Sequence, residues 1–163
     1  MNRSYGTMVL AGAVVVLDQA TKLLVRQRFA PFDSVQVIPG FFDLARVHNT
    51  GAAFGMLNGV DLPYKTALLA LVAVAALIGL TVFAASLPST HWLARVGVPL
   101  VVGGAVGNLI DRLTLGYVVD FLDFYWRGWH FWAFNVADAA ITVGMALIIL
   151  DQIGAGHRVS RAV

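Results

Sequence analysis

Aspartate is the residue type whose placement in this sequence points most directly to chemistry. The chain has nine Asp, no Glu and no Cys, so it offers no thiolate nucleophile and no disulfide. Its four His are scattered, at His48, His91, His130 and His157, and they form no metal-ligand spacing such as HxxxH. We therefore expect no metal ion and no other cofactor. No serine-base arrangement is visible either. Paired carboxylates are therefore the candidate catalytic groups.

Asp120 and Asp138 are the two carboxylates that would form such a pair. Asp120 lies between apolar neighbours, and Asp138 is interpreted as sharing a helix face with Asn135, three residues earlier. Two carboxylates within hydrogen-bond reach cannot both ionise cheaply, so one keeps its proton near neutral pH. The ionised one can take a proton from a water that attacks a peptide carbonyl, while the protonated one donates to the carbonyl oxygen. Taken singly, each Asp could instead make an ion pair or a hydrogen bond.

Other polar residues occur at helical spacing. Asn108 and Arg112 are four residues apart, which places an amide and a guanidinium on one helix face, suited to holding a substrate carbonyl or phosphate. Asp18 and Lys22 have the same spacing, and we interpret them as a structural pair that neutralises its charge within the membrane. For Asp111, beside Arg112 at a predicted helix end, an ion pair or a capping role is favoured over catalysis.

The elements that position these residues are predicted to be membrane helices. Of the 163 residues, 59% are hydrophobic and only 12% are charged, and the mean hydropathy is +0.79, whereas a soluble domain has about 25% charged residues. This composition excludes disorder, a coiled coil and most soluble enzymes. The formal net charge of +2, from scattered bases, gives no reason to expect a nucleic-acid partner. We predict one membrane-embedded domain over residues 1–163.

Four apolar segments have the length of a membrane crossing, at about 7–25, 65–85, 93–110 and 131–151. They predict an all-α integral membrane fold, a bundle of four transmembrane helices. The first segment could be a cleaved signal peptide. Its apolar run continues through 14–17, past the processing-like site at 10–13, which favours an uncleaved anchor.

An even number of crossings puts the two long connections, 26–64 and 111–130, on one side of the membrane. Polar helix ends border these connections, at 18–22, 108 and 135–138. Seven Lys and Arg lie on that side and four on the other, so the positive-inside rule would make it cytoplasmic. However, Lys22 and Arg112 are interpreted as intramembrane groups, and eight of the nine Asp lie on the same side. Charge therefore leaves the orientation open.

The 26–64 connection is predicted to contain short strands, because residues 35–47 mix β-branched and aromatic side chains around a Pro-Gly turn. The bundle thus carries a small β-rich element. The small, polar stretch 49–55 suits close backbone approach to a ligand, and an ordinary loop stays open. Residues 121–134 contain eight aromatic side chains, most of which we interpret as anchors at the membrane interface.

Five ordered blocks of the sequence resemble a known family. They are DQATK at 18–22, NTGAAFG at 49–55, GGAVGNLIDR at 103–112, VVDF at 118–121 and FNVAD at 134–138. Together they cover nearly the whole chain and are similar to the bacterial lipoprotein signal peptidases, signal peptidase II. The resemblance implies an aspartyl endopeptidase of the inner membrane that cleaves prolipoproteins just before the diacylglyceryl-modified Cys, without a cofactor.

The resemblance also implies roles and a location. Asp120 and Asp138 would be the catalytic pair, and five residues would position the substrate or that pair (Asn49, Gly51, Asn108, Arg112 and Asn135). The active site and the β-rich element would be extracytoplasmic, and both termini cytoplasmic. We expect the partners to be a lipidated prolipoprotein, membrane lipid and a globomycin-type inhibitor, and we expect a monomer. Trp132 and Ala139 depart from the Pro and Ser common in the family.

Two other classes of protein could use the same intramembrane polar residues. A small transporter or proton channel is one, although transporters usually show internal repeats and none is visible here. A scaffold or assembly factor is the other. It would tolerate replacement of Asp120 and Asp138 in a precursor-processing assay.

Overall fold

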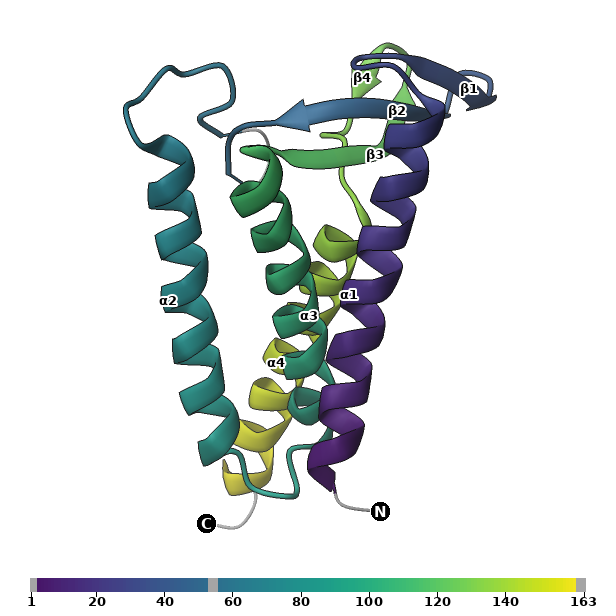
Figure 1. Cartoon of the computed structure of the whole chain (residues 1–163). Coiled ribbons are helices and arrows are strands. Elements are labelled where there is room, and N and C mark those ends of the chain that lie inside the picture. The colour runs from purple at the N-terminus through teal and green to yellow at the C-terminus, as the bar shows by residue number, and fades with distance from the viewer. Residues whose placement is uncertain (1–2, 53–55, 161–163) are drawn as a thin grey trace.

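Four long helices form the body of the protein in the computed structural model, which describes residues 3–52 and 56–160 and the side chains of 5–52 and 56–154. The helices are α1 (Arg3–Arg28), α2 (Lys65–Ser86), α3 (Trp92–Leu115) and α4 (Val136–Ser160). Within the described residues, each contains a stretch that is long and apolar enough to cross a membrane. The predicted bundle of four transmembrane helices is therefore confirmed (Figure 1).

Helix α3 is the centre of the bundle, because it packs against each of the other three helices. Glycines permit close approach on two of its faces. A Cβ at Gly103 would lie 2.7 Å from the Ala11 carbonyl oxygen of α1, and a Cβ at Gly104 would clash with the Ala137 carbonyl oxygen of α4. Helix α2 buries only Ala70 and presents apolar side chains around the rest of its surface, which is typical of a membrane span.

A four-stranded antiparallel sheet covers one end of the bundle, opposite the end where the two termini lie (Figure 1). Its strands, in order across the sheet, are β1 (Ser34–Ile38), β2 (Phe42–Asn49), β3 (Val118–Trp126) and β4 (Trp129–His130). The strands predicted in the 26–64 connection are confirmed. Strands β3 and β4 lie in a segment that the sequence predicted only as a connection. The register pairs Val47 with Asp120 and Asn49 with Val118, which brings the end of β2 beside the start of β3.

The predicted start of the fourth crossing is wrong. The sequence predicted a span from residue 131, but α4 begins at Val136. The residues before it are tied to β3, because the Phe131 N–H donates to the Phe124 carbonyl and the Phe134 N–H donates to the Leu122 carbonyl. Aromatic residues that pair with a sheet are as apolar as those of a span, so hydropathy alone does not separate the two.

The third crossing is longer than predicted. Helix α3 continues past residue 110 to Leu115 and ends at Gly116, whose φ of 83° is the left-handed conformation common at helix C-caps. Asp111 and Arg112 therefore lie inside the helix and not at its boundary. Asp120 lies in the strand beyond it, as the sequence predicted.

Candidate active site

Asp120 and Asp138 come together where strand β3 meets the start of α4. Asp120 is 2% exposed and follows two buried Val residues in β3, and Asp138 lies in the first turn of α4. The Asn135 side chain joins them. Its Nδ2 donates to Asp120 Oδ1 at 2.7 Å, and its Oδ1 accepts from the Asp138 N–H at 2.9 Å. The Asn135 side chain thus links the Asp120 carboxylate to the backbone of Asp138.

Asn135 and Asp138 form a capping box at the start of α4. The Asn135 N–H donates to Asp138 Oδ2 at 3.2 Å, which is the reciprocal of the bond from the Asp138 N–H to Asn135. The interpretation that Asn135 shares a helix face with Asp138 is wrong, because Asn135 precedes the helix and caps it. The spacing Asn-x-x-Asp before an apolar run is the signal that could have predicted this cap.

Asn49 supplies a second donor to Asp120. Its Nδ2 donates to Asp120 Oδ2 at 3.0 Å, and its Oδ1 accepts from the Gly51 N–H at 2.9 Å. Gly51 is buried, and a Cβ there would clash with the Met56 carbonyl oxygen. Arg112 holds the same turn, because its Nη2 donates to the Gly51 carbonyl at 2.9 Å. Residues 53–55 of the predicted ligand-binding stretch lie outside the described residues.

Asn108 is the corresponding donor to Asp138. Its Nδ2 donates to Asp138 Oδ1 at 2.8 Å, and its Oδ1 accepts from Lys22 Nζ at 2.9 Å and from Asn135 Nδ2 at 3.2 Å. Asn108 and Arg112 were predicted to share one helix face. The structure separates their contacts, because the Asn108 side chain contacts a candidate catalytic carboxylate and the Arg112 side chain contacts backbone carbonyls.

A buried ion cluster formed by Asp18, Lys22 and Asp111 lies next to these amides. Lys22 is 1% exposed, and its Nζ lies 2.8 Å from Asp18 Oδ2 and 3.1 Å from Asp111 Oδ2. The ion-pair role predicted for Asp111 is confirmed, and its partner is Lys22 and not the adjacent Arg112. Consecutive helical residues project about 100° apart, so Asp111 faces α1 while Arg112 faces the turn at Gly51.

Burial, together with the nearby charge of Asp138, raises the pKa of Asp120 from 3.8 to about 7. The hydrogen bonds donated by Asn49 and Asn135 lower the pKa, as does the charge of Lys22, but they do not outweigh burial. Near neutral pH the Asp120 carboxyl group is therefore divided between its two protonation states. It can accept or donate a proton there at little cost.

Three residues to which the sequence assigned no role form hydrogen bonds with neighbours of the site residues. Gln19 Nε2 donates to Asp111 Oδ1 at 3.0 Å. Asn58 Oδ1 accepts from the Thr50 N–H at 3.2 Å, and Lys65 Nζ donates to Thr50 Oγ1 at 3.2 Å. Gln19 and Lys65 could be noticed as polar residues at the ends of apolar spans. Asn58 carries no sequence signal, because its contact depends on how the loop folds back.

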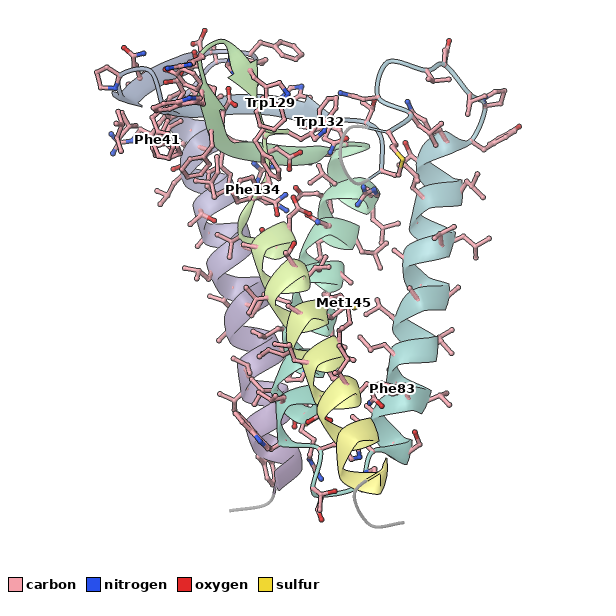
Figure 2. The ribbon with its side chains drawn as sticks, turned by 180° about the vertical axis from the view of Figure 1, so that it is seen from behind. Phe41, Phe83, Trp129, Trp132, Phe134 and Met145 are labelled. Atoms are coloured by element: carbon pink, nitrogen blue, oxygen red, sulfur yellow. The ribbon has the colours of Figure 1, made fainter. Side chains whose placement is uncertain are left out.

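The aromatic residues of 121–134 divide into two groups. Phe121 is 5% exposed and packs with Val25 and Val119 in a core at the sheet end of the bundle. Trp129 and Trp132 are 68% and 58% exposed and lie at the same end of the molecule (Figure 2). That such exposed rings anchor the protein at a membrane interface stays a prediction.

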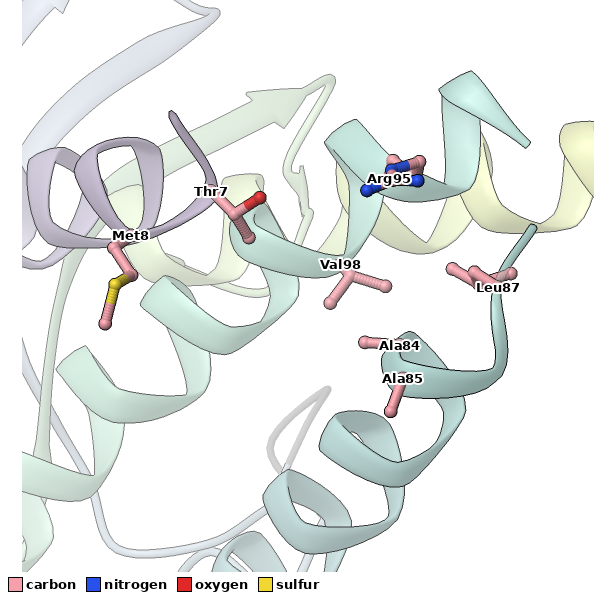
Figure 3. A pocket seen from close by; sticks show the side chains of 7 residues that line it. All are labelled: Thr7, Met8, Ala84, Ala85, Leu87, Arg95 and Val98. Atoms are coloured by element: carbon pink, nitrogen blue, oxygen red, sulfur yellow. The ribbon is translucent and has the colours of Figure 1, made fainter. Parts of the chain in front are cut away.

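Other possible binding features lie away from the two carboxylates. Among the described side chains, 5–52 and 56–154, no group of three His, Cys, Asp or Glu is placed to hold a metal ion. A hollow of about 360 Å³ opens between α1, α2 and α3 (Figure 3). It contains none of the candidate site residues and is lined by Thr7, Met8, Ala84, Ala85, Leu87, Arg95 and Val98.

Comparison with known proteins identifies the family. A family model described as signal peptidase (SPase) II matches residues 10–154. The chain belongs to the signal peptidase II family. It is similar to the lipoprotein signal peptidase of Symbiobacterium thermophilum, at 50% identity over 90% of this chain and 93% of that protein. It is also similar to the lipoprotein signal peptidase of Geobacter metallireducens, at 42% identity over 99% of each chain.

Solved structures agree with this membership in signal peptidase II. One described as a bacterial membrane enzyme superposes with a TM-score of 0.81 at 34% identity, covering 91% of this chain and 88% of that chain. The resemblance indicated by the five sequence blocks is therefore confirmed. Signal peptidase II is a peptidase family, and the four apolar helices make this member a multi-pass membrane protein.

Proposed function

We propose that this protein is an aspartyl endopeptidase that removes signal peptides from diacylglyceryl-modified prolipoproteins by cleaving before the lipidated Cys. The single observation that supports the dyad most strongly is that Asn135 donates to both carboxylates, from its side chain to Asp120 and from its backbone N–H to Asp138, while each carboxylate receives a further amide donor. A pKa of about 7 for Asp120 suits general acid–base work at neutral pH. The relatives named lipoprotein signal peptidase support the choice of substrate.

The chemistry needs only the two carboxyl groups and a water. The ionised carboxylate takes a proton from the water as its oxygen bonds to the scissile carbonyl carbon, and the protonated carboxyl donates to the carbonyl oxygen. When the tetrahedral intermediate collapses, the C–N bond breaks and the leaving amine takes a proton from a carboxyl group. One product ends in a new carboxylate, and the other begins with the amine of the lipidated Cys. The pair titrates as a unit, so neither Asp has a fixed resting role.

Asparagine amides and Arg112 support this chemistry indirectly. Asn49 and Asn135 hold the two oxygens of Asp120, and Asn108 holds one oxygen of Asp138. Arg112 steadies the turn at Gly51 through its carbonyl. With their orientation restricted by these bonds, the carboxylates need little rearrangement when the substrate arrives.

We also propose that the sheet end of the bundle faces the periplasm or outer surface of the inner membrane, with both termini in the cytoplasm. The two termini lie at the same end, opposite the sheet (Figure 1). Asp120 belongs to strand β3 of that sheet, and Asp138 contacts the Asn135 that binds Asp120. A substrate anchored in the membrane by its diacylglyceryl group would meet Asp120 and Asp138 where water is available. A globomycin-type cyclic peptide would compete for this site, and the protein would act as a monomer.

The proposal is tested by cleavage of a purified diacylglyceryl-modified prolipoprotein in detergent. Asp120→Asn and Asp138→Asn each remove one carboxylate from the dyad while keeping its size, so we expect loss of cleavage by at least about 10³-fold. Asp61→Asn, which changes an exposed carboxylate in the loop after β2, is the matched control and should cleave normally. Turnover near wild type in either dyad variant would remove that residue from the mechanism.

A further inference from the structure

We propose that Lys22 is a positioning residue for the dyad, because it fixes the direction of the Asn108 side-chain amide so that Asn108 donates to Asp138. This inference rests on the proposed function of Asp138. The sequence analysis gave Lys22 only a structural role, as the partner of Asp18. The structure adds a direct contact from Lys22 to a residue that touches the candidate dyad.

The Asn108 amide lies between an ammonium and a carboxyl group. Lys22 Nζ is 2.9 Å from Asn108 Oδ1, and Asn108 Nδ2 is 2.8 Å from Asp138 Oδ1. An ammonium only donates and an ionised carboxylate only accepts, so one direction of the amide satisfies both neighbours. The reversed amide would set its NH2 group against the Lys22 ammonium and its oxygen against Asp138. Asn135 Nδ2 donates to the same Asn108 oxygen at 3.2 Å, and Lys22 adds a full positive charge there. Lys22 therefore strengthens the amide direction that favours an ionised Asp138.

The same cluster holds the backbone just before each candidate catalytic Asp. Asp18 Oδ1 accepts from the N–H of Ala137, which precedes Asp138, at 2.9 Å. Asp111 Oδ2 accepts from the N–H of Val119, which precedes Asp120, at 3.0 Å. Because Lys22 bridges Asp18 and Asp111, it lies at the centre of a network that reaches both halves of the dyad.

Two of the helices packed around the dyad supply charged groups near it. Helix α1 supplies Asp18 and Lys22, α3 supplies Asp111 and Arg112, and the dyad itself comes from β3 and α4. Arg112 directs its side-chain donors to backbone carbonyls, so Lys22 is the basic residue that contacts a side chain bound to the dyad. The Lys22 charge also lowers the pKa of Asp120. Removing this charge should therefore raise the pKa of Asp120 and move the acidic limb of the pH dependence of cleavage to higher pH.

The test compares full-length variants in the prolipoprotein cleavage assay. Lys22→Met removes the ammonium but leaves two buried carboxylates, Asp18 and Asp111, without their positive partner. The double variant Lys22→Met with Asp111→Asn also removes one of these carboxylates, so the formal charge of the cluster stays unchanged. We expect the double variant to fold and to lose about 10- to 100-fold in kcat with little change in KM. We expect the shifted acidic limb in Lys22→Met alone, where the lost charge is not offset.

Two more variants separate positioning from stability. Asn108→Asp keeps an oxygen for Lys22 and replaces the donor to Asp138 by a carboxylate oxygen, so it should reproduce the loss in kcat even if Lys22 variants fold poorly. Asp151→Asn is the matched control. It breaks another buried contact, between Asp151 and His91 near the other end of the bundle, and should lower thermal stability without changing kcat or the pH profile.

The outcomes are distinct. A folded double variant with the kcat of the wild type overturns the role of Lys22 and leaves the dyad intact. Asn108→Asp with wild-type kcat overturns it as well. If the double variant regains both the stability and the activity that Lys22→Met loses, Lys22 serves folding alone and the inference is wrong. If the wild-type protein does not cleave the precursor, the proposed function itself fails.

Discussion

Replacing Asp120 by Asn should change the stability of the protein in a direction that depends on pH. In the folded protein the pKa of Asp120 is raised from 3.8 to about 7, so the folded state holds a proton that the unfolded chain releases near pH 4. The free energy of unfolding of the wild type should therefore fall as pH rises from about 4 to about 7. At about 1.36 kcal/mol for each pH unit, ionisation of Asp120 costs about 4 kcal/mol above this range.

The Asn variant avoids that cost but loses a hydrogen bond. Asn49 and Asn135 both donate to Asp120, one to each oxygen, and an Asn at 120 has a single acceptor. The NH2 group facing the second donor should cost about 2 kcal/mol. We therefore expect the variant to be less stable than the wild type near pH 4 by about 2 kcal/mol, and more stable above pH 7 by about the same amount.

Thermal unfolding in detergent, measured from pH 4 to pH 9, checks this expectation. The unfolding midpoints of Asp120→Asn and the wild type should cross between about pH 5 and pH 6.5. Asp61→Asn, which alters an exposed carboxylate, should stay at a constant difference from the wild type throughout. A difference between Asp120→Asn and the wild type that does not vary with pH would refute the reasoning, since Asp120 would then have an ordinary pKa.

Two further predictions concern packing and orientation. Gly104→Ala puts a methyl group against the Ala137 carbonyl and 2.8 Å from Ile141 Cγ1, so α4 must move. We expect Gly104→Ala to have a lower unfolding midpoint and about 100-fold lower kcat. The control Gly79→Ala places its methyl group in open space and should keep the unfolding midpoint and the kcat of the wild type. Unchanged kcat in Gly104→Ala would contradict the expectation. For orientation, an impermeant thiol reagent applied to intact cells should label Ser34→Cys, in strand β1, and should not label Ser89→Cys, in the loop between α2 and α3. Labelling of Ser89→Cys alone would show that the sheet end faces the cytoplasm and would contradict the proposed orientation.

The sequence predicted the parts of the fold that depend on hydropathy. After Lys65, helix α2 contains no charged residue, which is typical of a span, and its predicted bounds of 65–85 agree with Lys65–Ser86. The start of α4 was predicted five residues too early, because 131–134 are apolar for a different reason: Phe131 and Phe134 pair with β3. Hydropathy reports the tendency to leave water and not the partner that a residue finds.

The candidate site was predictable in its members more than in its contacts. Asp120, Asp138 and their Asn neighbours attract attention because polar residues are rare in such a chain. Helical spacing correctly paired Asp18 with Lys22, since both lie on one helix. The ion pair of Lys22 with Asp111 joins α1 to α3, and no periodicity within a single helix can reveal it. Adjacency in sequence suggested Arg112 as the partner of Asp111, but adjacent helical residues face apart.

The asparagines explain why both protonation states of Asp120 are accessible at neutral pH. Burial alone would keep the carboxyl group protonated, and no base would then be present to activate water. Donors alone would keep it ionised, and no acid would be present for the carbonyl oxygen. The oxygens of Asn49 and Asn135 are each held by a backbone N–H, at Gly51 and Asp138, so their NH2 groups must point at Asp120. Two fixed donors working against burial leave the pKa of Asp120 at about 7, where the group can serve as either acid or base.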